Sequence, residues 1–402
     1  MRPFDNRRVL LGVTGGIASY KSAILARLLT KAGADVDVVL TTSATEFIGA
    51  ITFEALTGRP VHTGLFDSGR ALDHIKLARA AEAVVIAPAT ADFLARAAAG
   101  QAGDLLTAVL LATSAPVLVV PAMNDLMWAH IQTQRNAQHV RELGYRVLEP
   151  EEGMLAAGEG SGPGRMPEPE TIFAHASRLL ELESALIGRR VVVTAGATRE
   201  PMDPVRFLSN HSSGKMGVAI AAAAWRRGAN VTLVAGAMTV DAPVGVETVR
   251  VETTEEMAVA VEQELAKADV LVMAAAPADF RPAQPTENKI KKSSAPAVIS
   301  LEPTPDILLR TRAARRDGAV VVGFALETND VLNGGRAKLS AKELDLIVVN
   351  DAREPGAGFA VDTNRVTFLG RDGTEDALPL LSKSDVADAI LDRVERILSG
   401  RR

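Results

Sequence analysis

Short β-branched runs alternate with alanine-rich helical stretches along all 402 residues of this chain. Such alternation is typical of parallel sheets whose strands are joined by crossover helices. The first residues show the plan, with a strand at 9–13, a glycine turn at 14–18, a helix at 20–31 and a second strand at 35–40. The pattern therefore predicts an α/β fold throughout.

The same plan returns in the second half of the chain. A strand at 191–194 is followed by a long loop, a helix at 217–227 and a further strand at 230–234. A chain of this length predicts two or three domains at roughly 150 residues each. Because the pattern breaks just before this repeat, we expect two Rossmann-like domains with parallel sheets, residues 1–187 and residues 188–402.

Two segments of similar sequence run from a buried strand into a loop of small residues, one at 83–93 (AVVIAPATADF) and one at 269–280 (DVLVMAAAPADF). In an open parallel sheet, ligands bind beyond the carboxyl ends of the strands. Alanine and proline would also suit a tight strand exit without a ligand. The occurrence of both loops favours two nucleotide-type sites.

Composition and charge exclude several classes of protein. The absence of Cys excludes disulfides, Cys-ligated zinc, iron–sulfur clusters and a thiolate nucleophile. The net charge of -5 disfavours a nucleic-acid binder. No apolar run approaches the ~20 residues that span a membrane, and Gly12, Gly15 and Gly16 interrupt the stretch that would make Arg7 and Arg8 a twin-arginine signal. We expect a cytoplasmic protein that does not associate with membranes.

The loop at 14–18 (Thr-Gly-Gly-Ile-Ala) leaves backbone N–H groups free at the start of a helix, where the helix dipole favours an anion such as phosphate. This signal is weak by itself. The loop lacks Gly-x-Gly-x-x-Gly spacing, and the chain has no Gly-x-x-x-x-Gly-Lys-Ser/Thr motif, so nicotinamide and P-loop chemistry are both disfavoured.

Further polar motifs occur in the first half: Thr42 after the second strand, His74, Pro88-Ala89-Thr90, and Pro-Ala-Met-Asn at 121–124. A lone His is commonly a solvated or capping residue, and an Asn in such a place is commonly a turn former. As a set, however, the motifs resemble the flavin mononucleotide (FMN)-dependent cysteine decarboxylases. The whole first half is similar to the phosphopantothenoylcysteine decarboxylase domain.

This resemblance implies a flavodoxin-like flavoprotein domain that decarboxylates its substrate with FMN as electron sink. The flavin would take electrons from the terminal cysteine carbon and return them after carbon dioxide departs. His74 would be the base, because an imidazole accepts a proton near neutral pH, and Asn124 would hold the substrate carboxylate. The implied cofactor-binding residues are Gly15, Gly16, Ile17, Thr42, Pro88, Ala89, Thr90 and Met123.

One segment departs from the family. Members commonly carry a flap of the form Ala-Cys-Gly followed by Gly-x-Gly-Arg, whose Cys is thought to donate a proton. Here 155–166 reads LAAGEGSGPGRM, so the flap is present without its thiol, and either Ala157 or Gly158 takes the Cys position. The proton would then come from water or from a neighbour such as Glu159, or the domain would be impaired.

The second half carries a loop dense in hydroxyls and glycines, with Arg206 and Asn210 inside it. Its composition suits a phosphate cradle, although a loop capped by Ser212 and Ser213 would look similar. At 288–292 the sequence Asn-Lys-Ile-Lys-Lys places three ammonium groups within four residues. Such a run suits polyphosphate, although charge runs are usually solvated.

These segments resemble the phosphopantothenate-cysteine ligase domain, a nucleotide-binding ligase, and the domain order matches the bacterial bifunctional enzymes. The resemblance implies that CTP, with Mg²⁺ held by unidentified ligands, activates 4'-phosphopantothenate as an acyl cytidylate that cysteine then attacks. Asn210 and Arg206 would hold the acyl intermediate, and Lys289 would face the reacting phosphate. The implied CTP-binding residues are Asp279, Lys289, Pro305, Asp306, Ile307, Leu308, Phe324, Lys338 and Lys342.

The sequence thus predicts a bifunctional enzyme that makes 4'-phosphopantetheine for coenzyme A synthesis. The family precedent is a homo-oligomer, a dodecamer of decarboxylase trimers and ligase dimers. One alternative is an active ligase fused to a flavin-binding regulatory or decarboxylation-impaired domain. Another is a nicotinamide-dependent oxidoreductase, which the missing fingerprint disfavours.

Overall fold

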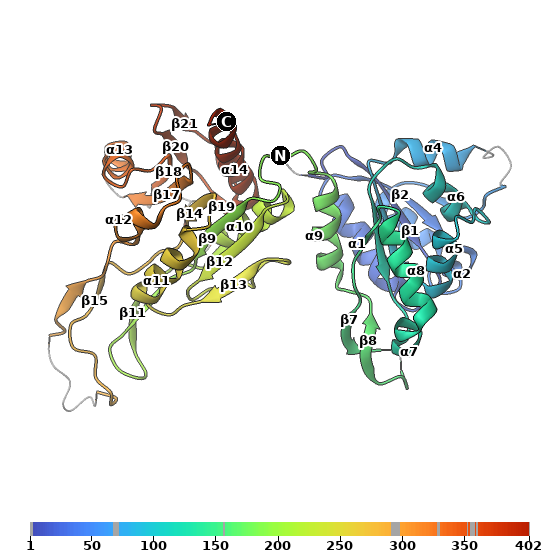
Figure 1. Ribbon diagram of the computed structural model, residues 1–402, viewed down its shortest axis with the longest axis horizontal. Helices are drawn as coiled ribbons and strands as arrows, with labels where there is room; N and C mark the ends of the chain where they lie inside the picture. Colours follow the sequence, from blue (N-terminus) through green and yellow to red (C-terminus); the bar gives the residue numbers. More distant parts are fainter. Residues whose placement is uncertain are drawn as a thin grey trace. The chain divides into compact units, whose positions relative to one another are not determined.

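The computed structural model describes residues 3–66, 72–155, 157–290, 298–327, 330–351, 353, 358 and 361–401. The chain separates into two compact units, residues 2–182 and residues 183–402 (Figure 1). None of the helices in these described ranges combines the length and the apolar character needed to cross a membrane.

The unit of residues 2–182 is built on a six-stranded parallel sheet in the order β3-β2-β1-β4-β5-β6. The strands are β1 (Arg8–Val13), β2 (Asp35–Leu40), β3 (Val61–His62), β4 (Ala83–Ala89), β5 (Val117–Pro121) and β6 (Arg146–Val147). This is the Rossmann order. Strands are added toward one edge from β1 to β3 and toward the other edge from β4 to β6, so the strand order reverses between β1 and β4. The predicted α/β class is confirmed. The sheet is doubly wound, as in flavodoxin, but its strand order is that of the Rossmann fold and not the flavodoxin order 2-1-3-4-5.

Helices cover both faces of this sheet because alternate strand residues point to opposite sides. Val9, Leu11 and Val13 belong to one buried cluster, whereas Leu10 belongs to the other. The first cluster includes residues of α1 (Ser19–Lys31), α3 (Ala50–Thr57) and α9 (Pro169–Leu179); the second includes residues of α4 (Asp73–Ala80), α5 (Ala91–Ala98), α6 (Leu105–Ala112), α7 (Asp125–Ala129) and α8 (Ile131–Glu142). A short helix α2 (Thr42–Thr45) follows β2, and β7 (Glu151–Met154) and β8 (Ser161–Arg165) form an antiparallel hairpin.

The unit of residues 183–402 repeats this strand order and extends it. Its sheet has the order β13-β12-β9-β14-β17-β18-β20-β21. Strand β20 pairs antiparallel with both of its neighbours, β18 and β21. The strands are β9 (Arg190–Ala195), β12 (Asn230–Ala235), β13 (Glu247–Arg250), β14 (Val270–Met273), β17 (Val320–Glu327), β18 (Leu346–Asp351), β20 (Thr367–Gly370) and β21 (Glu375–Ala377). The predicted second Rossmann-like sheet is therefore confirmed.

The helices of this unit also lie on both faces. Residues of α11 (Thr254–Leu265) and α12 (Ile307–Arg310) join one apolar cluster, against which α13 (Val331–Ala341) packs. The other face holds α10 (Lys215–Arg226) and α14 (Lys383–Gly400), which pack on each other. The remaining short elements are η1 (Thr311–Ala314), β19 (Thr363–Asn364) and β22 (Leu381–Ser382).

Two small antiparallel sheets project from the main sheet of this unit as an arm (Figure 1). One pairs β10 (Arg199–Pro201) with β11 (Phe207–Ser209), and the other pairs β15 (Phe280–Pro282) with β16 (Leu301–Pro303). Strands β10 and β15 lie against each other, so the two sheets are neighbours.

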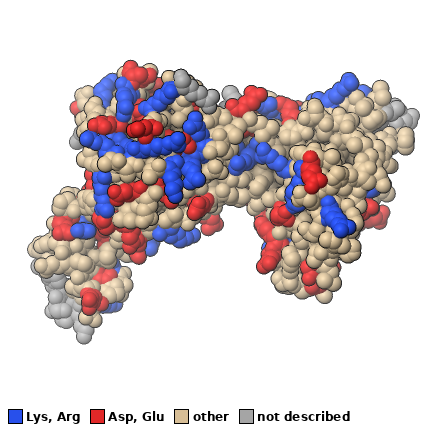
Figure 2. Space-filling view, viewed as in Figure 1, with Lys and Arg blue, Asp and Glu red and all other residues tan. Residues whose placement is uncertain are grey.

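Basic and acidic side chains are interleaved over the face of this unit shown in Figure 2. Ion pairs of this unit include Arg371 with Asp345 (3.4 Å) and Arg316 with Asp269 (2.9 Å). The unit therefore carries many neighbouring charges of opposite sign.

Candidate functional sites

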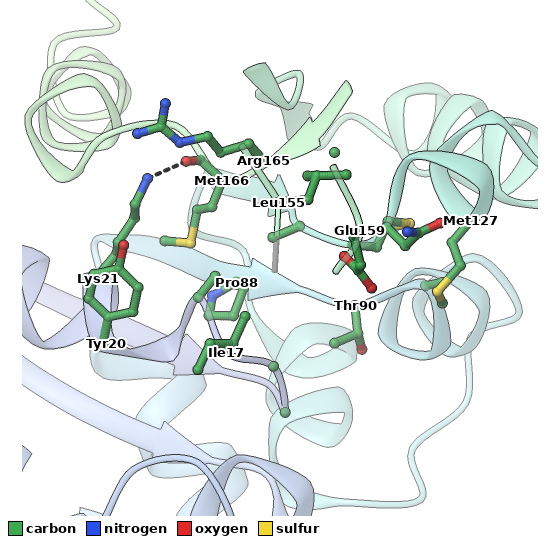
Figure 3. A pocket seen from close by; sticks show the side chains of 18 of the residues that line it. Ile17, Tyr20, Lys21, Pro88, Thr90, Met127, Leu155, Glu159, Arg165 and Met166 are labelled. Carbon is green, nitrogen blue, oxygen red and sulfur yellow. Dashed lines mark hydrogen bonds between the residues drawn. The ribbon is translucent and has the colours of Figure 1, made fainter. Parts of the chain in front are cut away.

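The first candidate site is a pocket of about 380 Å³ at the carboxyl ends of β1, β4 and β5 (Figure 3). It lies beside the point where the strand order reverses, which is where ligands bind in open α/β sheets. Its lining residues are Gly15, Gly16, Ile17, Ala18, Tyr20, Lys21, Pro88, Thr90, Ala91, Ala122, Met123, Asn124, Met127, Met154, Leu155, Glu159, Gly164, Arg165 and Met166.

Two glycines bring the backbone close to neighbouring segments in this pocket. A Cβ at Gly15 would fall 2.4 Å from the Cβ of Ser43, and a Cβ at Gly164, where φ is +142°, would fall 2.3 Å from the carbonyl oxygen of Met123. Only glycine fits these positions without displacing backbone. The pocket therefore has a backbone cradle of the kind that receives a cofactor.

Hydrogen bonds join the loops that follow β1 and β4. The Thr14 hydroxyl donates to the carbonyl oxygen of Pro88 (2.8 Å) and accepts from the amide of Thr90 (3.1 Å). The Thr90 hydroxyl in turn accepts from the Phe93 amide (3.3 Å) and caps α5. Residues far apart in sequence are thus held at one edge of the sheet.

The cations that line the pocket are paired. Lys21, which is 4% exposed, donates from Nζ to the carbonyl oxygen of Met166 (2.7 Å) and forms an ion pair with Glu168 (3.1 Å). Arg165 forms an ion pair with the same carboxylate. Sequence reasoning missed Lys21, although a Lys on the apolar face of a helix is a signal that could have revealed it.

Most of the predicted cofactor-binding residues line this pocket, and so does the residue predicted to bind the substrate carboxylate. They are Gly15, Gly16, Ile17, Pro88, Thr90, Met123 and Asn124. Asn124 caps α7, with Oδ1 accepting from the Leu126 amide (3.0 Å), which leaves its Nδ2 group for a ligand.

Three predicted residues do not line the pocket. Ala89 is fully buried within β4, and Thr42 is exposed at the start of α2 while its neighbour Thr41 supplies the cap. His74 lies on α4, and its Nδ1 atom is buried without a hydrogen-bond partner among the described residues. The structure of a single chain therefore does not bring His74 together with Asn124.

The second candidate site is a pocket of about 380 Å³ at the carboxyl ends of β9, β14, β17 and β18. Its described lining residues are Asn210, Ser212, Ser213, Gly214, Lys215, Met216, Ala274, Ala275, Ala276, Pro277, Asp279, Phe324, Ala325, Leu326, Asn350, Gly358, Asn364 and Lys383. Three of the predicted ligase residues are among them, namely Asn210, Asp279 and Phe324. Asn210 donates from Nδ2 to the carbonyl oxygens of Ala276 (3.2 Å) and Pro277 (3.0 Å), which fixes the loop after β14.

The amino terminus of α10 gives this pocket a positive end. Lys215 occupies the first turn and pairs with Asp362 (2.6 Å). Lys383 is 7% exposed and donates to the carbonyl oxygens of Gly358 (3.0 Å) and Val361 (2.6 Å); burial, and then the nearby Lys215 ammonium, lower its pKa. Two ammonium groups beside a helix amino terminus favour an anion. The sequence predicted the loop that holds Asn210 as part of this site. It did not predict Lys383, which is the first residue of the last helix, α14.

Arg206 and Lys289 lie on the arm and do not line the pocket. The buried Asp203 carboxylate accepts from the amides of Val205 (2.9 Å) and Ile290 (3.1 Å), which ties the two segments of the arm together. The Arg206 guanidinium, which also donates to Asp203, holds the pKa of that carboxyl well below its usual range. Lys289 is exposed, and residues 291 and 292 of the lysine run lie outside the described residues.

The other predicted CTP-binding residues also fall outside the pocket lining. Asp306 caps α12 and pairs with Lys342 (2.8 Å), while Ile307 and Leu308 are buried in the apolar cluster. Pro305 directly precedes this cap. Lys338 lies in the last turn of α13, and Lys342 follows its final residue as the C-cap, so the two lysines are at the end of one helix.

A metal centre made by the protein alone is not present in the part of the chain that the structure describes. No group of three or more His, Asp or Glu side chains there is placed to hold a metal ion.

Two family models match the chain, one for each unit. The model described as "Flavoprotein" matches residues 2–181, and the model described as "DNA/pantothenate metabolism flavoprotein C-terminal domain" matches residues 186–398. Together with the doubly wound fold and its two strand-end pockets, these matches define a two-domain flavoprotein of pantothenate metabolism.

Curated relatives extend over nearly the whole chain. The "Coenzyme A biosynthesis bifunctional protein CoaBC" of Mycobacterium tuberculosis (strain ATCC 25618 / H37Rv) is 50% identical over 410 residues, which covers 98% of this chain and 97% of that protein. The protein of the same name from Vibrio cholerae is 44% identical over 395 residues, covering 97% and 98%. The chain belongs to this family of bifunctional coenzyme A biosynthesis proteins, so the predicted family and the predicted bifunctional enzyme are confirmed.

One solved structure that the chain matches is the crystal structure of the C-terminal domain of a coenzyme A biosynthesis bifunctional protein CoaBC. It is 41% identical and has a TM-score of 0.47, and the match covers 54% of this chain and 100% of that domain.

Proposed function

We propose that residues 1–187 decarboxylate phosphopantothenoylcysteine with FMN and that residues 188–402 form this compound from 4'-phosphopantothenate and cysteine with CTP. The product of the two steps is 4'-phosphopantetheine. The observation that carries the proposal is the presence of one strand-end pocket in each domain of a bifunctional coenzyme A biosynthesis protein. We further propose that the enzyme works in the cytoplasm.

The first pocket fits a flavin nucleotide. Its volume of about 380 Å³ lies in the range of cofactor pockets, and Gly15, Gly16 and Ile17 at the start of α1 would hold the phosphate. Pro88, Thr90 and Met123 would contact the ring system, and Asn124 would bind the substrate carboxylate. FMN would supply a reversible electron sink. The flavoprotein match favours this cofactor over the nicotinamide of the alternative oxidoreductase.

His74 needs a second chain to act in this pocket. Its imidazole lies on α4, outside the lining of its own chain's pocket, and its buried Nδ1 has no hydrogen-bond partner among the described residues. We propose that copies of the chain associate, in line with the predicted homo-oligomer, so that His74 of one copy serves the pocket of another.

In the second unit, the CTP phosphates would lie at the amino terminus of α10. Lys215 and Lys383 would neutralise their charge there, and Mg²⁺ would bind mainly through the phosphates. Asn210 and Asp279 would position the acyl cytidylate beside the loop after β14. Arg206 and Lys289 would act only where the arm covers a pocket, either of its own chain or of a second copy.

An assay with separate readouts tests both half-reactions. Supplying 4'-phosphopantothenate, cysteine and CTP should release pyrophosphate and then carbon dioxide. Replacing CTP with ATP should suppress the release of pyrophosphate. Supplying phosphopantothenoylcysteine alone should release carbon dioxide without any nucleotide. Pyrophosphate release without carbon dioxide from either mixture would favour the alternative, an active ligase fused to a flavin-binding regulatory domain. Absence of both would overturn the proposal.

A further inference from the structure

Glu159 lies at the tip of the β7–β8 hairpin and lines the first pocket. It stands between Gly158 (φ +91°) and Gly160 (φ +81°), whose left-handed conformations shape the tip. The Leu155 amide donates to the carbonyl oxygen of Gly160 (3.0 Å) and closes the turn. Figure 3 shows the Glu159 carboxyl group on the side of the pocket where Thr90 and Met127 lie.

Glu159 is the only carboxylic acid among the described lining residues. The other ionisable lining residues are Tyr20, Lys21 and Arg165, and the two cations are held by Glu168. A guanidinium does not release its proton in proteins. Tyr20 lies beside Lys21, away from Glu159, in Figure 3.

The Glu159 carboxyl is also not committed to another role. It has no hydrogen bond or ion pair with any described residue, and it is exposed to solvent at the hairpin tip. A group in this position can exchange protons with water and still face a molecule in the pocket.

Decarboxylation requires a proton at the carbon that loses carbon dioxide. The electron pair of the broken C–C bond stays with the substrate, and the product differs from the substrate by one CO₂ lost and one proton gained at the α-carbon. A positioned acid typically accelerates such a transfer by about 10²- to 10⁴-fold.

We propose that Glu159 is the general acid that protonates the α-carbon after carbon dioxide has left, an assignment that rests on the proposed decarboxylase function. The O–H bond of the Glu159 carboxyl breaks as the new C–H bond forms, and the carboxylate takes up a proton from solvent before the next turnover. Because this step transfers only a proton, it does not change the oxidation state of the substrate and flavin taken together.

The test compares Glu159→Gln with Glu152→Gln, a matched control on the same hairpin that is exposed and does not line the pocket. Flavin-loaded protein is mixed with phosphopantothenoylcysteine, and a rapid quench measures carbon dioxide and 4'-phosphopantetheine separately. Glu159→Gln should release the first equivalent of carbon dioxide at the parental rate but form product about 100-fold more slowly or worse. Glu152→Gln should match the parent in both, and Glu159→Asp should recover part of the rate.

Two further readouts distinguish acid catalysis from a structural role. Formate should accelerate product formation by Glu159→Ala and leave the parent unaffected. In the complex with 4'-phosphopantetheine, infrared difference spectra should show the carbonyl stretch of a protonated carboxylic acid that disappears in Glu159→Gln. FMN affinity should be the same in all these variants.

Product formation by Glu159→Gln at the parental rate would overturn the assignment. Loss of FMN binding in Glu159→Gln would also overturn it, because Glu159 would then be a structural residue of the hairpin. A parent protein that binds FMN but releases no carbon dioxide would instead show that the proposed function itself fails, and the assignment would fall with it.

Discussion

The pocket of residues 2–182 and the pocket of residues 183–402 lie at corresponding strand ends of two sheets with the same core order, but different elements line them. The first is formed mainly by loops that directly follow β1, β4 and β5, with one hairpin added. The second draws Asn350, Asn364 and Lys383 from the carboxyl-terminal part of its unit. Both pockets therefore combine segments that are distant in the sequence, but only the second includes a residue from the last helix of its unit.

The two pockets also differ in the partners that hold their cationic side chains. In the first, Lys21 and Arg165 share the single carboxylate of Glu168, and all three lie on α1 or near the end of β8. In the second, Lys215 pairs with Asp362, and Lys383 is held by backbone carbonyl oxygens. The two cations of the first pocket thus share one carboxylate, whereas those of the second have separate partners.

The largest expected effect tests whether His74, which does not line the pocket of its own chain, takes part in the reaction of the first site. His74→Asn should reduce carbon dioxide release by roughly 10²- to 10⁴-fold, because the base is lost, while FMN binding is retained. His130→Asn is the matched control, since His130 caps α8 and Asn caps equally well. Carbon dioxide release by His74→Asn at the parental rate would remove His74 from the reaction.

The next effect tests whether the arm belongs to the second site. Lys289→Ala should slow pyrophosphate release about 100-fold, which corresponds to about 3 kcal/mol of lost transition-state stabilisation. Flavin binding and carbon dioxide release from phosphopantothenoylcysteine should not change. Lys267→Ala, an exposed lysine just beyond α11, should have no effect. Near-normal pyrophosphate release by Lys289→Ala would exclude the arm from the site.

A smaller effect tests the backbone cradle of the first pocket. Gly15→Ala should weaken FMN binding roughly 10- to 100-fold, because a Cβ there collides with Ser43 and displacing the loop costs about 1–3 kcal/mol. Gly49→Ala is the control, since a Cβ at Gly49 comes no closer than 3.8 Å to the Ile51 side chain. Equal FMN affinity, measured by flavin fluorescence, would show that the loop after β1 does not hold the cofactor.

The smallest effect concerns stability against pH. Burial first, and then Arg178 and Arg146, lower the pKa of His175 to about 4, whereas the unfolded chain takes up this proton near pH 6.5. The unfolded state therefore binds more protons between these values, and the unit of residues 2–182 should lose about 1–2 kcal/mol as pH falls from about 6.5 to about 4.

The second unit should not lose stability in that window through Asp203, whose pKa is lowered, because such a carboxylate loses its contribution only at more acid pH. Hydrogen exchange of the full chain at several pH values measures the two units separately. His175→Gln should flatten the dependence of the first unit. An unchanged slope in that variant would assign the effect to other groups.

The repeated strand and helix pattern was predictable from the sequence because it depends on local periodicity. The strand expected at 35–40 is β2, and the helix expected at 20–31 differs from α1 by one residue. The helix expected at 217–227 begins earlier, at Lys215, because Gly214 with φ +79° forms its N-cap. Thr90, which directly follows β4, was also found at the first pocket, since parallel strands all end at one edge.

The amino-acid sequence by itself thus determined the two α/β domains, their glycine loops and the family of the protein. Only the tertiary structure decided which side chains meet at each pocket: it buried Lys21 against Met166, placed Glu159 at the first pocket and left His74 outside it. The physical reason is that periodicity and turn chemistry act over a few residues, whereas a pocket depends on packing between segments that are more than a hundred residues apart in the chain.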